Sequence, residues 1–135
     1  MTPPTTGVLV FDGRCGFCTR TVGWLRLLDR DARVTTLPYQ QAGAPEKAGS
    51  TAAACADEVH FAAGGRTVTG AAAVNAALGV ALRTDLPERV YSRTAPLQDR
   101  VYAWAARHRG RLPGTTPWCE RYPELCAASS RTTEP

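Results

Sequence analysis

Apolar and polar positions follow two different periods in the first thirty residues. Residues 8–11 are a short, continuous apolar run, which predicts a buried strand. The run stops at Asp12-Gly13, and apolar residues then recur at helical spacing over residues 16–30. One broad face of that segment carries Phe17, Cys18, Val22, Trp24, Leu25 and Leu28. The pattern therefore predicts a strand, a tight turn and an amphipathic helix laid against a core.

Beyond this unit, the pattern predicts further strands and helices. A second strand over residues 33–37 ends at Pro38, and a hairpin joins residues 58–62 to 66–69 through a glycine-containing turn. The predicted helical segments are an alanine-rich 44–56, a small-residue 71–82, a short 86–93 and a last helix bracketed by Pro96 and Gly110. Residues 111–135, rich in Pro, Thr and Ser, are predicted as loop and tail.

The order of these elements predicts a single α/β domain. A strand–helix–strand unit followed by strand–strand–helix gives a central mixed β-sheet flanked by helices, with an extra C-terminal helix. A chain of 135 residues can bury such a core without metal or disulfide staples. We expect residues 7–122 to form the domain, with flexible ends at 1–6 and 123–135. Trp24 and Trp104 are predicted to anchor its core.

Two cysteines three positions apart, Cys15 and Cys18, stand at the predicted start of the first helix. Unpaired N–H groups and the helix macrodipole stabilise a thiolate there, and the thiolate is the nucleophile of thiol–disulfide exchange. Cys18 falls on the apolar face, whereas Cys15 lies in the first turn, where solvent can reach it. We therefore predict that Cys15 is the attacking thiolate and that Cys18 is the resolving thiol that closes the intramolecular disulfide.

Two charged neighbours should act on these thiols. Arg14 is expected to lower the pKa of Cys15, and Asp12 to raise it if its carboxylate stays ionised nearby. Asp12 has two open roles. The first is a helix cap or turn residue, and the second is a proton acceptor for one of the thiols during exchange.

A metal site is the competing interpretation of the cysteine pair. A structural zinc takes four ligands, usually from two C-x-x-C pairs or from one pair and matched histidines, and neither pattern occurs here. The remaining candidates are Cys55, His60, His108, Cys119 and Cys126. We interpret Cys55 as a small buried hydrophobe, His60 as a strand side chain and His108 as a helix-terminal cation. Cys119 and Cys126 either pair with each other, or Cys119 approaches the active site as a third thiol.

The chain resembles the DCC family of thiol-disulfide oxidoreductases, a thioredoxin-like group named for its D-x-x-C-x-x-C motif. Asp12, Cys15 and Cys18 occupy the motif positions within VLVFDGRCGFCTRTV at residues 8–22. Softer similarities follow at residues 36–40, where a strand ends in Pro with a nearby Gln, and in the hairpin and helix at residues 65–78. Residues 101–109 resemble the family's late Y-x-W-x-A-x-x-R helix, and Cys119 its late cysteine.

This resemblance, over roughly residues 7–122, implies a thioredoxin-like domain that acts as a thiol-disulfide oxidoreductase of the protein-disulfide reductase type. The implied partners are a disulfide-containing protein or a small thiol or disulfide, and an electron-donating thiol reductant. No organic cofactor or metal is expected. Thioredoxins place a cis-proline opposite their C-x-x-C, where it helps bind partner peptides, but residues 55–59 contain no proline. A non-catalytic thioredoxin-like binding module is the alternative from another functional class.

The net charge of +4 is concentrated in residues 83–121, which hold eight arginines against four acidic residues. Because aromatic residues do not interleave with these arginines as stacking platforms would, we expect a solvated basic face and no nucleic acid. Such a face would steer an acidic partner or an anionic thiol toward the site. No signal-peptide pattern follows the first six residues, and the longest apolar stretch, 71–82, is too short to span a bilayer. These features predict a cytoplasmic protein without a membrane partner.

Overall fold

The structure, a computed structural model, describes residues 4–126. It begins with the predicted strand–helix–strand unit, formed by β1 (Gly7–Phe11), α1 (Gly16–Leu28) and β2 (Val34–Pro38). The elements that follow are α2 (Ala44–Lys47), α3 (Ala52–Asp57), β3 (His60–Ala63), β4 (Arg66–Thr69), α4 (Gly70–Leu82), α5 (Leu86–His108) and α6 (Trp118–Arg121). This order confirms the predicted α/β class and is consistent with a thioredoxin-like fold.

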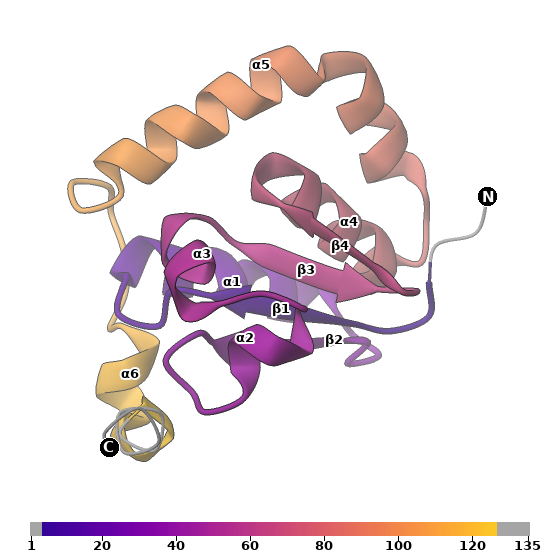
Figure 1. Cartoon of the computed structure of the whole chain (residues 1–135). Helices are drawn as coiled ribbons and strands as arrows, with labels where there is room; N and C mark the ends of the chain where they lie inside the picture. Colours follow the sequence, from indigo (N-terminus) through magenta and orange to yellow (C-terminus); the bar gives the residue numbers. More distant parts are fainter. Residues whose placement is uncertain (1–3, 127–135) are drawn as a thin grey trace.

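The four strands form one mixed sheet in the order β2-β1-β3-β4 (Figure 1). β1 runs parallel to β2, with Phe11 opposite Pro38, and antiparallel to β3, with Val10 opposite His60. β3 and β4 form the predicted hairpin. The loop that follows β1 therefore lies at the same end of the sheet as the segment that leads into β3.

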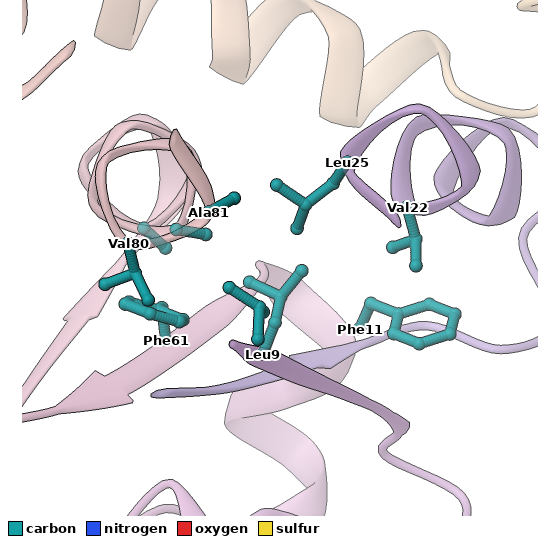
Figure 2. Close-up of a cluster of buried hydrophobic side chains, with 10 residues drawn as sticks. Leu9, Phe11, Val22, Leu25, Phe61, Val80 and Ala81 are labelled. Atoms are coloured by element: carbon teal, nitrogen blue, oxygen red, sulfur yellow. The ribbon is translucent and has the colours of Figure 1, made fainter. Parts of the chain in front are cut away.

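Helices cover both faces of the sheet. On one face, Leu9 and Phe11 pack with Val22 and Leu25 of α1 and with the small residues of α4 (Figure 2). On the other face, Val10 packs with residues of α2 and α3. Because β1 is buried on both faces, its sequence is apolar throughout rather than alternating.

α5 packs on α4 and continues toward the end of the sheet at which β1 ends (Figure 1). The amide of Asn75 in α4 donates to Oε1 of Gln98 in α5 over 2.7 Å. The two helical segments predicted for this region are one element with a kink at Thr94, whose φ of −122° and ψ of 15° are not helical. Pro96, two residues later, accounts for the kink, because proline removes a backbone donor and its ring crowds the preceding turn.

Some predicted boundaries differ from those observed. The predicted helix 44–56 is divided into α2 and α3, because Gly49 adopts a left-handed φ of 64° between them. Residues 111–135 were expected to be loop and tail, but they include α6. Within residues 4–126, no helix combines the length and apolar character needed to cross a membrane. Residues 1–3 and 127–135 of the predicted flexible ends lie outside the described residues.

The prediction that two tryptophans anchor the core is wrong. Trp24 is 52% exposed and Trp104 is 49% exposed. The guanidinium of Arg20 lies over the Trp24 ring, and the Trp104 ring stacks on His108. The buried face of α1 therefore differs from the one that the apolar pattern predicted, because it includes Thr19 and leaves out Trp24.

Candidate active site

Of the three predicted site residues, Asp12 and Cys15 lie in the loop between β1 and α1, and Cys18 lies in the first turn of α1. The amide of Cys15 donates to the carbonyl of Asp12 over 3.2 Å, and the amide of Arg14 donates to Asp12 Oδ1 over 3.0 Å. Asp12 is therefore a turn residue, as predicted, but it does not cap the helix. Cys15 is the cap, because its Sγ accepts the backbone N–H of Cys18 over 3.1 Å.

Gln40 and Gly13 hold this loop in place. Gln40 Oε1 accepts the amide of Gly13 over 3.0 Å, and Gln40 Nε2 donates to Asp12 Oδ1 over 2.9 Å. A Cβ on Gly13 would lie 2.6 Å from Cβ of Pro38 and 2.8 Å from Sγ of Cys119, so a larger residue would displace the loop. One amide side chain thus fixes both the turn and the orientation of the carboxylate.

A segment from the other end of the chain, residues 114–118, crosses the start of α1, and we refer to it as the strap. The amide of Thr115 donates to the carbonyl of Gly16 over 3.2 Å. Gly114 approaches so closely that a Cβ there would clash with the backbone of Gly16 and Phe17. The amide of Trp118 donates to Oγ1 of Thr19, which explains why that threonine is buried.

Cys119 and Cys126 form a disulfide. The sequence left open whether these two cysteines pair or Cys119 serves as a third thiol of the site, and the structure shows that they pair. The amide of Cys119 also donates to the carbonyl of Gly13 over 2.9 Å, so the disulfide lies behind the active-site loop. The cysteines of the C-x-x-C are free thiols in this structure.

Arg109, just after α5, is the site residue that the sequence reasoning missed. Its Nη2 lies 3.2 Å from Asp12 Oδ2, and its Nη1 lies 3.9 Å from Cys18 Sγ. Nη2 also donates to the carbonyl of Ala56 over 3.2 Å. The signal in the sequence was its position as the last residue of the Y-x-W-x-A-x-x-R similarity, but that similarity gave no indication that it meets the thiols.

The two thiols have opposite pKa shifts. The side-chain hydrogen bond with Cys18, helped by the Cys18 amide and the charge of Arg109, lowers the pKa of Cys15 to about 6 against the effect of burial. Asp12 opposes this shift, as predicted, whereas Arg14 is not among its causes. The hydrogen bond with Cys15 and burial raise the pKa of Cys18. These opposite shifts favour the thiolate form of Cys15 and the protonated form of Cys18.

Each thiol lines a different cavity. Cys15 borders a cavity of about 540 Å³, the polar cavity, whose wall includes Arg14 and Thr115 of the strap. Cys18 borders a pocket of about 300 Å³, the apolar pocket, walled mainly by apolar side chains of β1, α1 and α4. Asp12 and Arg109 line both cavities, so their ion pair lies at the boundary between them.

The other candidate side chains do not form a metal site. His60 is buried and its Nε2 lies 3.1 Å from Oγ of Ser50. Cys55 is buried in the core, as predicted. His108 stacks on Trp104 at the surface. Among residues 4–126, no three His, Cys, Asp or Glu side chains gather closely enough to hold a metal ion.

The model of the DCC1-like thiol-disulfide oxidoreductase family matches residues 9–115. The match includes Asp12, Cys15, Cys18 and Arg109 and ends before α6. No curated protein and no solved structure is significantly similar to the chain.

Proposed function

We propose, for a chain that belongs to the DCC1-like thiol-disulfide oxidoreductase family, that Cys15 and Cys18 form its redox pair. Family membership supports thiol–disulfide exchange in general, and the geometry at the start of α1 supports the assignment of roles. The observation that carries the proposal is the 3.1 Å hydrogen bond from the amide of Cys18 to Sγ of Cys15. This bond is part of the reason why the pKa of Cys15 falls to about 6.

The proposed reaction has two steps in the reducing direction. The Cys15 thiolate attacks one sulfur of a substrate disulfide, which forms a mixed disulfide and releases the first thiolate product. Cys18 then loses its proton and attacks Sγ of Cys15, which releases the second product and leaves a Cys15–Cys18 disulfide. Two electrons pass from the protein to the substrate, and a thiol reductant restores the dithiol.

We assign separate roles to the two charged residues beside the pair. Arg109 is a positioning residue, because its guanidinium approaches Cys18 Sγ and favours the thiolate that must form in the second step. Asp12 is the proposed acceptor of the Cys18 proton, directly or through one water. Its carboxylate is held in place by Gln40 and by Arg109 itself.

Family membership implies a disulfide or thiol as substrate. Whether the substrate is a protein disulfide or a small disulfide stays a prediction, as does the use of a thiol reductant. The reaction needs no organic cofactor, since the electrons are carried by the two sulfurs. The cytoplasmic location also stays a prediction.

Turnover distinguishes an enzyme from a non-catalytic binding module. We would measure reduction of insulin and of bis(2-hydroxyethyl) disulfide by dithiothreitol, with and without the protein. Acceleration of either reaction is expected, and neither Cys15→Ser nor Cys18→Ser should turn over at the wild-type rate. Rates equal to those of dithiothreitol alone, for both substrates, would contradict the proposal.

The reduction potential of the pair defines the favoured direction. Values near about −270 mV are typical of a reductase and values near about −120 mV of an oxidant. A lowered pKa of Cys15 stabilises the dithiol relative to the disulfide, because only the reduced protein carries the thiolate. We therefore expect a potential above the reductase value.

A further inference from the structure

We infer that the polar cavity receives a small disulfide that carries carboxylate groups, and that Arg14 selects it by charge. The inference rests on the proposed function, because it names the substrate class of the same thiol. It chooses between the two substrate classes that the family leaves open, a protein disulfide and a small disulfide.

The backbone around the site has little capacity to bind an extended peptide. Recognition of a peptide by strand-like pairing requires free N–H and C=O groups on the receiving segment. The amide of Val59, just before β3, donates to Oη of Tyr102 over 2.9 Å, and its carbonyl accepts the amide of Gly70 over 3.0 Å. The carbonyl of Ala56 accepts from Arg109. The start of α4, α5 and the residue that follows α5 therefore occupy groups that a substrate peptide would need.

The strap limits the space on another side. Gly114 and Thr115 line the polar cavity, and Gly114 lies in direct contact with the backbone at the start of α1. The cavity volume of about 540 Å³ falls within the roughly 300–1,000 Å³ at which proteins bind small molecules. A site bounded in this way suits a small disulfide better than a folded protein surface.

Charge around the polar cavity favours an anion. The carboxylate of Asp12 in its wall is paired with Arg109 over 3.2 Å, which leaves the charge of Arg14 to a ligand. The first turn of α1 contains no acidic residue to offset the positive end of its dipole. When Cys15 enters a mixed disulfide, the thiolate charge leaves the cavity. A carboxylate on the bound half of the substrate would then balance the excess positive charge.

The exchange balances without a further reactant. Cys15 attacks R–S–S–R to give a Cys15–S–S–R bond and R–S⁻, and Cys18 then displaces the second R–S⁻. The products are a Cys15–Cys18 disulfide and two R–S⁻. These become thiols by taking the proton of Cys18 and one proton from solvent.

A set of matched small disulfides tests the charge preference. The reduced full-length protein would be mixed with dithiodiglycolate, bis(2-hydroxyethyl) disulfide or cystamine, which are anionic, neutral and cationic. Its oxidation in a single turnover would be followed by quenching with an alkylating reagent and mass spectrometry. Each rate constant is divided by that of the same disulfide with free 2-mercaptoethanol, which removes differences in intrinsic reactivity. The normalised rates should fall in the order anionic, neutral, cationic, and the differences should shrink at high salt.

Two arginine variants locate the preference. Arg14→Gln should lower the ratio of anionic to neutral rates by about two- to fivefold, which is the range of an exposed charge pair. Arg66→Gln is the control, because Arg66 is exposed and begins β4 at the opposite end of the sheet from the site. It should leave the ratio unchanged.

The outcomes separate this inference from the function on which it rests. Equal normalised rates, a preference for cystamine, or an equal effect of the two arginine variants would overturn the inference while leaving thiol–disulfide exchange in place. Faster oxidation by insulin than by dithiodiglycolate would also overturn it. If no disulfide oxidises the protein, the proposed function itself fails.

Discussion

Cys15 and Cys18 lie one helical turn apart, yet their surroundings are opposite. Cys15 accepts a backbone N–H and borders the polar cavity, whereas Cys18 is more deeply buried and borders the apolar pocket. One hydrogen bond between the thiols moves both pKa values, downward for Cys15 and upward for Cys18. The comparison teaches that two identical groups acquire different acidities from a few neighbours, which suits them to the proposed roles of nucleophile and resolving thiol. The variants and titrations below test how far this difference extends.

Removing each thiol separately should have the largest effect. Cys15→Ser should reduce exchange to the uncatalysed rate, because the nucleophile is lost. Cys18→Ser should still complete the first step and accumulate a mixed disulfide, since the intermediate at Cys15 has no fast intramolecular exit. Intact-protein mass spectrometry after incubation with a disulfide measures both results. If both variants trap the substrate equally, or neither does, the two thiols do not have distinct roles.

Asp12→Asn should slow exchange with little effect on folding. Asparagine can still accept the amide of Arg14 in the turn, but it cannot accept a proton. We expect turnover to fall by about 10²-fold, at the lower end of the effect of losing a general base. Thermal unfolding of the same variant shows whether the fold is kept.

The pH–rate profile of Asp12→Asn separates base catalysis from a charge effect. Loss of the base lowers the plateau. Loss of the negative charge instead moves the midpoint to lower pH, because Asp12 raises the pKa of Cys15. An unchanged plateau and midpoint would leave Asp12 as a turn residue only.

Alkylation should distinguish the thiols by pH. With limiting iodoacetamide, Cys15 should react first, at a rate that rises with pH through a midpoint of about 6 and then levels off. Cys18 should react only at much higher pH, because its pKa is raised. Arg109→Gln should move the Cys15 midpoint upward, because the guanidinium charge favours the thiolate, whereas Arg109→Lys should move it less. Labelling of Cys18 before Cys15, mapped by peptide mass spectrometry, would reverse the assignment.

Replacing both Cys119 and Cys126 with serine should have the smallest effect on exchange. The disulfide closes a short loop and supports the segment behind Gly13, so its loss should lower the free energy of unfolding by about 2 kcal/mol. Urea unfolding measures this change. Exchange by the folded double variant should stay within about a factor of two. A much larger loss of turnover in folded protein would show that the disulfide contributes to exchange beyond its effect on stability.

Local features of the site could be predicted from the sequence, because they depend on residues close along the chain. The change from a continuous apolar run to helical spacing places Cys15 and Cys18 at a helix start, and the helical period correctly places Cys18 deeper than Cys15. The α/β order of elements follows from the same periods.

Contacts between distant segments could not be predicted in this way. The helical period indicates an apolar face on α1, but it does not reveal that the strap covers Thr19 while Trp24 stays exposed. Gln40 and Arg109 reach Asp12 from 28 and 97 positions further along the chain, and no local pattern encodes either contact. The sequence therefore predicted that a cation lowers the pKa of Cys15, but it indicated Arg14, whereas the structure has Arg109 in that role.

The sequence separation of 91 residues between Arg109 and Cys18 has a consequence for biosynthesis. The helix that carries the cysteines leaves the ribosome long before the arginine is translated. A nascent chain therefore exposes the two thiols before the Arg109 guanidinium can pair with Asp12 and before the strap can cover the start of α1. Only after Arg109 and the strap have been translated can the pair gain the environment that distinguishes its two thiols, so this centre acquires its reactivity well after its cysteines are made.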